Sequence, residues 1–460
     1  MNLTFWPFAL DIALALALFF GWVFALQVIR ERRTPAATLA WVTVLVLFPI
    51  LGVLIYLLVG TRKRELKHVR LRGLTATGTA MLHFEQAHVL DRMLRRLSIP
   101  PASIGNDIEI AWRPEAAMEG LLKVIDGARD RLWLLMYIFE DDDSGFRVME
   151  ALQRAAERGV TVRVMVDDLG SYGRIDSSRR ALEAAGGQII RFKPVWYALW
   201  KRMVNLRNHR KILVADGERA WTGGRNIGDH YLRTGKSEWL DLSAVVTGPA
   251  ALALEEICRN DWSFTTGAEL PLSPVVVPSA EGPATLQVLP SGPEYREDLW
   301  HAALVKGCFE AHTRLWIATP YFVPDETVMN AIVTAARSGI DVRILIPHRS
   351  DNLVVDMVGR SYLREVQRTG AKVFRYKLGM MHAKAVLVDE QLALLGSANV
   401  DARSFFLNYE STLVGYDEAT TRPISAFFEY GFARANKGVR PVSRVTESLT
   451  SIARLFSPML

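Results

Sequence analysis

The chain has 460 residues, half of them hydrophobic, and carries a formal net charge of +6 with an isoelectric point near 9.3. This length exceeds that of one ordinary domain and predicts two or three. The positive charge favours an anionic partner, either nucleic acid or an acidic lipid surface. Only two cysteines are present, which excludes a disulfide framework and a cysteine-rich zinc site.

Two long apolar runs, residues 12–29 and 39–59, stand near the N-terminus. At about 1.5 Å per residue the first run reaches about 27 Å as a helix, close to a hydrocarbon core of about 30 Å. Trp41 and Tyr56 are placed as interfacial anchors. A cleaved signal peptide is the alternative, but the first run lacks a basic leading segment and a small-residue cleavage site. We therefore expect a retained, two-helix transmembrane hairpin over residues 1–62.

Basic residues flank the second apolar run and bear on its orientation. Two crossings put both chain ends on one side, and the larger basic group, at positions 62–72, favours the cytoplasmic side. The three arginines between the runs, at positions 30–33, oppose this assignment. Residues 63–106 are predicted to be a connector, and its basic residues are either a solvated face or a contact for anionic headgroups.

An alternation of strands and helices is predicted for a first lobe over residues 107–263. The helical patterns cover residues 116–128, 146–158 and 179–185, and the apolar strand patterns cover residues 131–139 and 160–166. Such alternation predicts an α/β fold with a mixed, mostly parallel sheet covered by helices.

A second lobe over residues 294–440 repeats this pattern. Residues 314–318 match 131–135, and residues 335–344 match 155–164, at nearly the same offset along the chain. An internal duplication is the simplest explanation. Residues 264–293 contain six prolines and are predicted to be a linker. Residues 441–460 are predicted to be an amphipathic helix that packs on the core or on lipid.

The strongest functional signal is a motif that occurs twice with one internal spacing. The first copy consists of His209, Lys211, Asp216, Gly223 and Asn226. The second copy consists of His382, Lys384, Asp389, Gly396 and Asn399. The apolar run before each aspartate predicts a strand, on which positions two apart face the same side. Each histidine should therefore project together with its lysine.

Two imidazoles, two ammonium groups and two carboxamides that converge suit a tetrahedral phosphoryl anion. The lysines would neutralise charge, and the non-bridging oxygens would be bound by Asn226, Asn399, Gly224 and Ser397. One histidine attacks phosphorus, while the other protonates the leaving alcohol and then deprotonates the incoming one. This chemistry needs no metal or cofactor, and the pattern leaves open which histidine attacks.

Carboxylates accompany both motifs. Asp241 follows Asn226 along the chain, Glu410 follows Asn399, and both carboxylates are predicted to orient the imidazoles. Asp216 and Asp389 complete the catalytic motif but end their strands, where structural ion pairs are expected rather than phosphate contacts.

The remaining histidines show no ligand spacing and are expected to be structural: His68, His83, His88, His230, His301, His312 and His348. The apolar segment with Trp196, Trp200 and Met203 is either a membrane-dipping loop or ordinary core.

The paired motifs resemble those of the phospholipase D superfamily, and nearly the whole chain resembles the bacterial cardiolipin synthases within it. The residues that carry the resemblance are Arg33-Thr34-Pro35, Pro49-Ile50-Leu51-Gly52, Tyr137-Ile138-Phe139, Asn208-His209-Arg210-Lys211, Gly223-Gly224-Arg225-Asn226-Ile227-Gly228-Asp229, Tyr321-Phe322-Val323-Pro324-Asp325-Glu326, Asn399-Val400-Asp401-Ala402-Arg403-Ser404-Phe405 and Asn408-Tyr409-Glu410.

The resemblance implies two phospholipase D-like lobes in a multi-pass protein of the bacterial inner membrane. It implies phosphatidyl transfer between two phosphatidylglycerol molecules, which yields cardiolipin and glycerol through a phosphatidyl-histidine with the first histidine as nucleophile. Anionic membrane lipid, not nucleic acid, is then the partner. His230 and the pair Leu242-Ser243 depart from the family pattern beside the first motif, which bears on the acceptor alcohol.

Two other functions compete with phosphatidyl transfer. A hydrolase of the same superfamily, a phospholipase D or a nuclease, shares every catalytic residue, although a nuclease has little use for a membrane hairpin. A non-catalytic, lipid-binding scaffold would not need all six motif residues. The sequence leaves open the balance of transfer and hydrolysis, the choice of phosphatidylglycerol or phosphatidylethanolamine as donor, and the oligomeric state.

Overall fold

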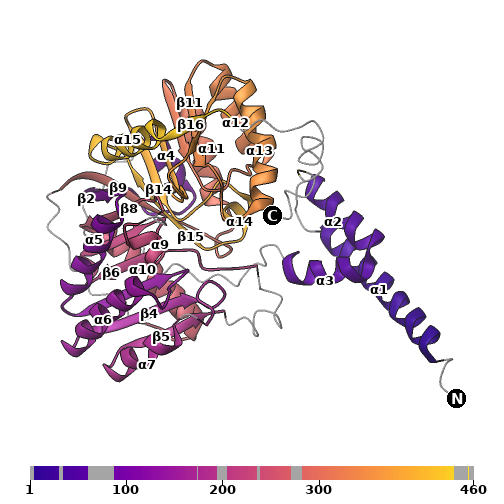
Figure 1. Ribbon diagram of the computed structural model, residues 1–460, viewed down its shortest axis with the longest axis horizontal. Helices are drawn as coiled ribbons and strands as arrows, with labels where there is room; N and C mark the ends of the chain where they lie inside the picture. Colours follow the sequence, from indigo (N-terminus) through magenta and orange to yellow (C-terminus); the bar gives the residue numbers. More distant parts are fainter. Residues whose placement is uncertain are drawn as a thin grey trace.

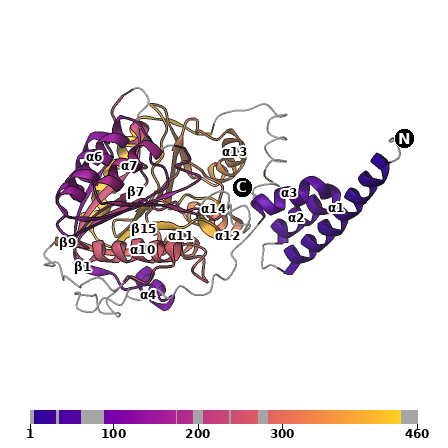
Figure 2. The same ribbon diagram turned by 90° about the horizontal axis from the view of Figure 1, so that it is seen from below.

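The computed structural model describes residues 5–30, 35–60, 88–173, 175–193, 205–235, 239–270 and 282–439, and residue 454. In these ranges two sheets with covering helices form one body, and a group of N-terminal helices extends away from it (Figures 1 and 2). Several sequence features lie outside the described residues: the basic group at 62–72, His68 and His83, the Trp196–Met203 segment, the middle of the predicted linker, and the C-terminal helix apart from residue 454.

The N-terminal segment forms α1 (Phe5–Arg30), α2 (Pro35–Leu47) and α3 (Pro49–Val59). The second apolar run is broken before Pro49, because proline favours the first position of a new helix. Trp41 and Tyr56 were predicted to be interfacial anchors, but they are buried in the core of this group with ring centroids 5.3 Å apart.

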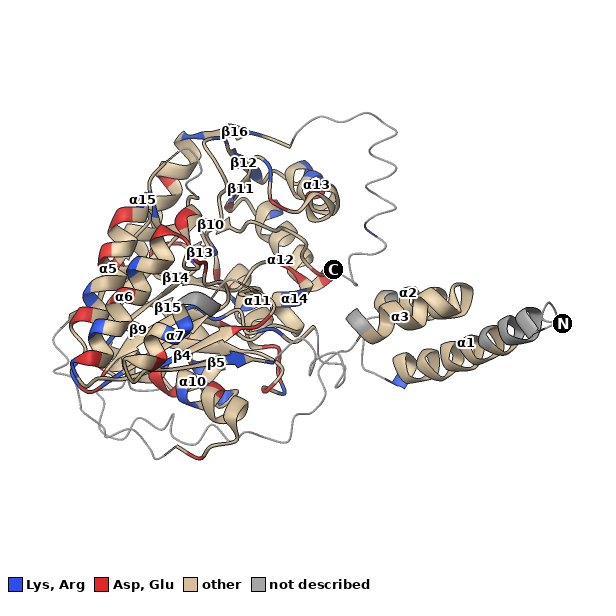
Figure 3. Ribbon diagram, turned by 60° about the horizontal axis from the view of Figure 1, so that its bottom comes forward, with Lys and Arg blue, Asp and Glu red and all other residues tan. Residues whose placement is uncertain are grey.

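None of the helices in the described parts of the chain has the length and apolar content required to cross a membrane. The two predicted spanning segments are therefore not confirmed. The outer faces of α1, α2 and α3 nevertheless expose many large apolar side chains. Figure 3 shows that α2 and α3 carry no charged side chain.

The first lobe has a seven-stranded sheet in the order β2-β8-β7-β6-β3-β4-β5. Its strands are β2 (Asp107–Ala111), β3 (Arg131–Met136), β4 (Thr161–Asp167), β5 (Gln188–Phe192), β6 (Ile212–Ala215), β7 (Arg219–Gly223) and β8 (Ser243–Thr247). Its helices are α5 (Pro114–Asp126), α6 (Asp143–Glu157), α7 (Asp176–Ala184), α9 (Asp229–Leu232) and α10 (Pro249–Thr266).

The second lobe has a nine-stranded sheet in the order β1-β9-β15-β14-β13-β10-β11-β12-β16. Its strands are β1 (Ser103–Gly105), β9 (Gly282–Ser291), β10 (Arg314–Ala318), β11 (Asp341–Pro347), β12 (Lys372–Tyr376), β13 (Ala385–Val388), β14 (Leu392–Gly396), β15 (Glu410–Gly415) and β16 (Ala435–Lys437). Its helices are α11 (Leu299–Glu310), α12 (Glu326–Arg337), α13 (Leu353–Arg368), α14 (Ala402–Phe406) and α15 (Glu418–Ala433).

The two sheets share one strand order, since β8-β7-β6-β3-β4-β5 corresponds to β15-β14-β13-β10-β11-β12. The predicted duplication is thus seen in the fold. Each sheet is mixed, but only two strand pairs in each are parallel, β3–β4–β5 and β10–β11–β12. The expectation of a mostly parallel sheet is wrong, because each motif strand turns back at its aspartate into an antiparallel hairpin.

Two predicted connecting segments contribute to the second lobe. The end of the predicted linker forms β9, which pairs with β15 and β1 of the second sheet. The start of that linker belongs instead to the first lobe, where it continues α10 to Thr266. Within the predicted connector, α4 (Val89–Arg96) packs on α11 through buried leucines, and β1 extends the second sheet. Prolines near the two ends of β9 suggested a linker, although a strand tolerates proline best near its ends.

Candidate active site

The two histidine motifs meet at the seam between the lobes. The backbone N–H of His209 donates to the carbonyl of Tyr409 at 2.9 Å, and the N–H of Tyr409 donates to the carbonyl of Arg207 at 2.9 Å. On the other side of the seam, the N–H of His382 donates to the carbonyl of Leu240 at 2.8 Å. Each motif is therefore fixed to the opposite lobe just before β6 or β13 begins.

Each histidine contacts a carboxylate from the other lobe. His209 Nδ1 lies 2.9 Å from Glu410 Oε2, and His382 Nδ1 lies 2.6 Å from Asp241 Oδ2. The structure places the two predicted orienting carboxylates at the imidazoles, but in a crossed arrangement that the sequence did not indicate. Since a carboxylate binds Nδ1 in both rings, Nε2 is the nitrogen expected to take part in chemistry, and in His382 it also lies 2.9 Å from Lys384 Nζ.

Further residues hold the carboxylates themselves. Glu410 accepts hydrogen bonds from Ser397 Oγ at 2.5 Å, Ser404 Oγ at 3.0 Å and Asn408 Nδ2 at 3.3 Å. A Cβ atom at Gly224 would lie 2.3 Å from Asp241 Oδ1. Ser397 and Gly224 were predicted to bind phosphate; the structure shows both against the two carboxylates, and their phosphate-binding role stays a prediction. Ser404 and Asn408 were not recognised as site residues.

The two lysines are buried beside their histidines. Lys211 Nζ donates to the carbonyl of His209 at 2.7 Å. Lys384 Nζ donates to the carbonyl of His382 and lies 2.9 Å from each nitrogen of that ring. The predicted projection of histidine and lysine to one side is therefore observed in both lobes.

The two asparagines lie shortly after the ends of β7 and β14. Asn226 Oδ1 accepts a hydrogen bond from the N–H of Ile138 at 3.2 Å. Asn399 is fixed through its backbone, which donates to Ser404 Oγ and accepts from Trp300 Nε1. Its buried Oδ1 has no hydrogen-bond partner among the described residues. A phosphate-binding role for both asparagines remains a prediction.

Asp216 and Asp389 lie at the far ends of the motif strands, away from the histidines. The carboxylate of Asp216 accepts the backbone N–H groups of residues 129–131 at 2.9 Å. The carboxylate of Asp389 does the same for residues 312–314 at 2.8–3.0 Å. A catalytic role for Asp216 and Asp389 therefore stays a prediction, and backbone amides rather than ion pairs are their main partners. Both residues have positive φ, 56° and 51°, as the turns require.

Comparison with known sequences decides the family. The family model described as "Cardiolipin synthase, PLD-like domain" matches residues 121–262 and 308–431, and so covers one motif in each lobe. Cardiolipin synthase 1 of Bacillus cereus is 34% identical over 462 residues, which cover 94% of this chain and 90% of that protein. The chain belongs to the cardiolipin synthase family. It is an enzyme of the phospholipase D superfamily.

Other comparisons agree with this membership. Cardiolipin synthase A of Pseudomonas aeruginosa is 34% identical over 469 residues, covering 96% of this chain and 94% of that protein. The family model "Phospholipase_D-nuclease N-terminal" matches residues 13–60. The crystal structure of phosphatidylserine synthase from Haemophilus influenzae superposes with a TM-score of 0.62 at 15% identity, covering 81% of this chain and all of that one. That likeness concerns the fold.

Burial dominates the electrostatics of the site. It lowers the pKa of His209 and of His382 to about 4, against the opposing effect of the carboxylates. Burial likewise lowers the pKa of Lys384 to about 8 and lowers that of Lys211. Burial alone would raise the pKa of Asp241, but His382 and Lys384 bring it down to about 2. At neutral pH the free site therefore holds neutral imidazoles beside ionised carboxylates.

Aromatic rings surround both imidazoles. The centroid of Tyr137 lies 4.8 Å from that of His209, while Trp239 and Tyr231 lie 5.2 and 5.5 Å from His382. These rings desolvate the histidines, and their role was missed in the sequence. A signal was available for Tyr137, because Tyr321 follows the equivalent strand of the second lobe.

One residue that departs from the family pattern, His230, lies beside these aromatic rings. The His230 ring stacks on Trp239 with centroids 5.7 Å apart, as expected for a structural histidine. Across the described ranges, no group of three or more His, Cys, Asp or Glu side chains is arranged to hold a metal ion.

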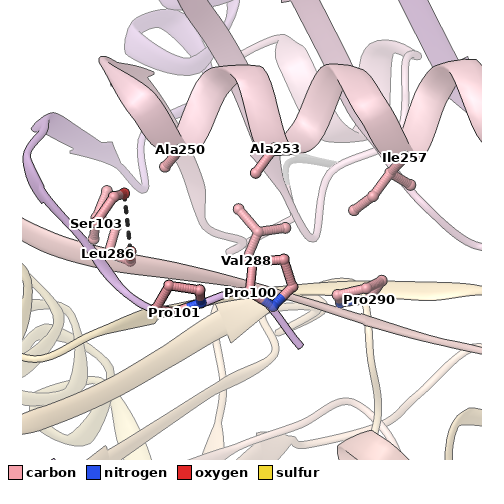
Figure 4. Close-up of a pocket in the computed structure, with 9 residues that line it drawn as sticks. All are labelled: Pro100, Pro101, Ser103, Ala250, Ala253, Ile257, Leu286, Val288 and Pro290. Atoms are coloured by element: carbon pink, nitrogen blue, oxygen red, sulfur yellow. Dashed lines mark hydrogen bonds between the residues drawn. The ribbon is translucent and has the colours of Figure 1, made fainter. Parts of the chain in front are cut away.

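A small apolar recess lies elsewhere, between α10, β9 and the segment before β1 (Figure 4). Its lining includes Pro100, Ala253, Ile257 and Val288, and its volume of about 30 Å³ is that of roughly one water molecule. No residue of either histidine motif lines it, so it is separate from the reaction chemistry.

Proposed function

We propose that the protein is a phosphatidyltransferase that makes cardiolipin and glycerol from two molecules of phosphatidylglycerol. The observation that carries the proposal is the pair of buried histidines at one seam, each with its Nδ1 bound by a carboxylate of the opposite lobe. Two such imidazoles supply a nucleophile and an acid–base group for double displacement at phosphorus. The names of the relatives support cardiolipin as the product.

In the first step, the neutral Nε2 of His209 attacks phosphorus, and the bond from phosphorus to the glycerol headgroup oxygen breaks. His382 gives its proton to that oxygen, and glycerol leaves. In the second step, His382 takes a proton from a headgroup hydroxyl of another phosphatidylglycerol. The resulting oxygen attacks phosphorus, cardiolipin forms, and His209 is released.

The assignment of His209 as the nucleophile has a physical reason. Lys384 Nζ lies 2.9 Å from the His382 ring nitrogens, and an adjacent ammonium favours release of a proton from imidazolium. Lys211 contacts the carbonyl of His209, and the ring of that histidine faces Tyr137. His382 therefore suits the acid, and His209 suits the nucleophile. The anionic phosphate brings the charge that favours protonation of His382 in the complex.

We also propose that α1, α2 and α3 anchor the enzyme as an integral hairpin in a bacterial inner membrane. Large apolar side chains on these helices are exposed, for example Phe19 at 62%, Trp22 at 59% and Leu39 at 68%. Exposure of so many apolar groups is unfavourable in water and favourable in lipid. After alkaline carbonate washing of cell membranes, the full chain should stay in the pellet; its release would refute the anchor.

Exposed apolar residues near the site fit a lipid substrate. Tyr172 follows β4, while Leu353 and Leu378 follow β11 and β12, and they are 68%, 73% and 57% exposed. The last residue of β4, Asp167, accepts the N–H of Asn208 at 3.0 Å, so the loop after β4 borders the first motif. These loops would let acyl chains remain in the bilayer while headgroups reach the seam.

The deciding experiment is product analysis with the purified full chain in mixed micelles of phosphatidylglycerol and non-ionic detergent. We expect cardiolipin and glycerol in equal amounts. Phosphatidic acid without cardiolipin would refute transfer and assign the protein as a phospholipase D-type hydrolase. Labelled phosphatidylethanolamine, added as a competing donor, tests the donor: label in cardiolipin would refute phosphatidylglycerol as the sole phosphatidyl source.

A further inference from the structure

Two buried arginines break the symmetry between the motifs. Arg210 and Arg225 belong to the first motif, and the equivalent positions of the second motif hold Ala383 and Ala398. All four residues are buried, with Arg210 at 2% and Arg225 at 0% exposure. A buried guanidinium requires several hydrogen-bond partners. Because the second motif has alanine at both equivalent positions, the two arginines indicate a role that is specific to the first motif.

Arg210 lies between the lobes behind His209. Its Nε donates to the backbone carbonyl of Glu410 at 3.0 Å. Its two terminal nitrogens lie 2.5 Å from Asp261 of α10 and 2.5 Å from Glu294, which follows β9. Two carboxylates from different lobes thus hold the guanidinium, and the guanidinium holds the main chain of the residue that orients His209.

Arg225 makes the corresponding contact for His382. Its Nη2 donates to the backbone carbonyl of Asp241 at 2.8 Å and to that of Trp112 at 2.6 Å. Its Nη1 donates to the carbonyl of Tyr231 at 2.5 Å, and the ring of Tyr231 lies against His382. Both orienting carboxylates, one from each lobe, therefore have their backbone carbonyls bound by a first-motif arginine.

We propose that Arg210 and Arg225 are positioning residues, Arg210 acting on His209 through Glu410 and Arg225 acting on His382 through Asp241. The inference rests on the proposed two-histidine reaction. A hydrogen bond from histidine to carboxylate orients the ring only while the main chain behind the carboxylate is fixed. A displacement of about 1 Å in a reacting group can cost about 100-fold in rate.

The first test substitutes Arg210→Lys and Arg225→Lys, which keep the charge but replace a planar, multiply donating group by a single ammonium. We expect kcat to fall about ten- to 100-fold, with KM changed less than about twofold, since the phosphate contacts remain. The matched control is Arg131→Lys, because Arg131 Nη2 donates to the backbone carbonyl of Asp216 at 2.8 Å, away from the histidines. An equal loss in the control would overturn the proposal.

The second test is a set of double-mutant cycles that a general loss of stability would not reproduce. In a Glu410→Gln background, Arg210→Lys should lower kcat only slightly further. In an Asp241→Asn background, it should lower kcat by the same factor as in the wild-type enzyme. Arg225→Lys should show the reverse pattern. Equal losses in both backgrounds would refute the assignment. If Arg210→Lys does not fold, Arg210→Gln with Glu294→Gln removes one charge of each sign and serves in the same cycles.

The cycles are measured both on phosphatidylglycerol and on a soluble aryl phosphodiester. A wild-type enzyme that cleaves the diester but forms no cardiolipin would refute the proposed function. The double-mutant cycles could then still be measured with the diester as substrate. A wild-type enzyme that forms cardiolipin while the cycles are additive would refute only the positioning roles.

Discussion

Asp241 of the first lobe and His382 of the second are joined by a contact of 2.6 Å between Oδ2 and Nδ1. The reciprocal contact, between His209 and Glu410, runs in the opposite direction across the same seam. Neither of these histidine–carboxylate pairs lies within one lobe. The reaction centre therefore forms only where the two lobes meet. The first prediction concerns the two carboxylates.

Asp241→Asn and Glu410→Gln should each lower kcat by about 100-fold or more. The amides keep the shape but lose the negative charge that fixes the ring tautomer and stabilises the imidazolium, and a comparable change in serine proteases costs about 10⁴-fold. The rates are measured by cardiolipin formation at saturating phosphatidylglycerol. Asp126→Asn, at a half-exposed carboxylate 3.7 Å from Arg154, is the control and should retain full activity. Full activity in Asp241→Asn would contradict the orienting role.

Removal of either histidine should abolish turnover, but only one variant should retain labelled lipid. With His209 as nucleophile, His382→Ala still permits slow attack, whereas His209→Ala has no group to form the covalent bond. Donor carrying ³²P is mixed with each variant, and the denatured protein is assayed for acid-labile label. Label on His209→Ala would reverse the assignment, and label on neither variant would contradict the covalent intermediate.

The pH profile of kcat/KM should fall as pH rises above about 4 and should fall more steeply above about pH 8. Burial lowers the pKa of both histidines to about 4, so His209 is neutral and able to attack, whereas His382 must take up the proton that it then gives to the leaving oxygen. The alkaline fall is expected because burial lowers the pKa of Lys384 to about 8, and the ammonium that we propose binds phosphate loses its charge as pH rises through that value.

The variant Lys384→Arg separates this lysine from other titrating groups. Its guanidinium stays protonated over the whole range, so the alkaline fall should move to higher pH even if the rate is lower. Micelles of constant composition keep the surface charge fixed. An alkaline limb that stays near pH 8 in Lys384→Arg would show that another group titrates there.

Gly224→Ala should lower kcat by about 100-fold. The added Cβ would lie 2.3 Å from Asp241 Oδ1, so the carboxylate must move away from His382. Gly235→Ala is the matched control, because a Cβ there meets no atom of the described residues within 4 Å. Initial rates and melting temperatures of both variants are compared. A normal rate for Gly224→Ala would show that the Asp241 carboxylate can shift without consequence.

Asp216→Ala should reduce stability rather than chemistry. The carboxylate satisfies three backbone N–H groups, and an unsatisfied buried donor costs about 1–3 kcal/mol. The free energy of unfolding in urea should fall by about that amount, while kcat of the folded fraction changes little. A loss of kcat as large as that of Asp241→Asn would instead support a catalytic role for Asp216.

Much of the site could be predicted from sequence because its signals are local. The spacing of His209 and Lys211 on a strand predicts a shared face, and the recurrence of the motif around His382 predicts the second half-site. The crossed pairing with Glu410 could not be derived, since spacing along the chain reveals neighbours within a lobe and not contacts across a seam.

Other differences have similar physical reasons. Gly224 and Ser397 were assigned to phosphate because small residues at a turn let backbone amides approach a ligand. Here their amides donate to Leu242 and Ser411, Gly224 leaves room for the Asp241 carboxylate, and Ser397 donates to Glu410. Trp41 and Tyr56 were assigned to an interface from their positions near the ends of an apolar run. The break before Pro49 turns both rings into the core between the helices.

The strand β1 stands before the first lobe in the chain but is hydrogen-bonded to β9, which follows that lobe, with Ser103 opposite Leu286. The whole first lobe is thus inserted between two pieces of the second sheet. During synthesis from the N-terminus, β1 cannot pair with β9 until the first lobe and β9 have been synthesised. The N-terminal helices, joined to the body through α4 and β1, are therefore attached in space to the lobe that is made last.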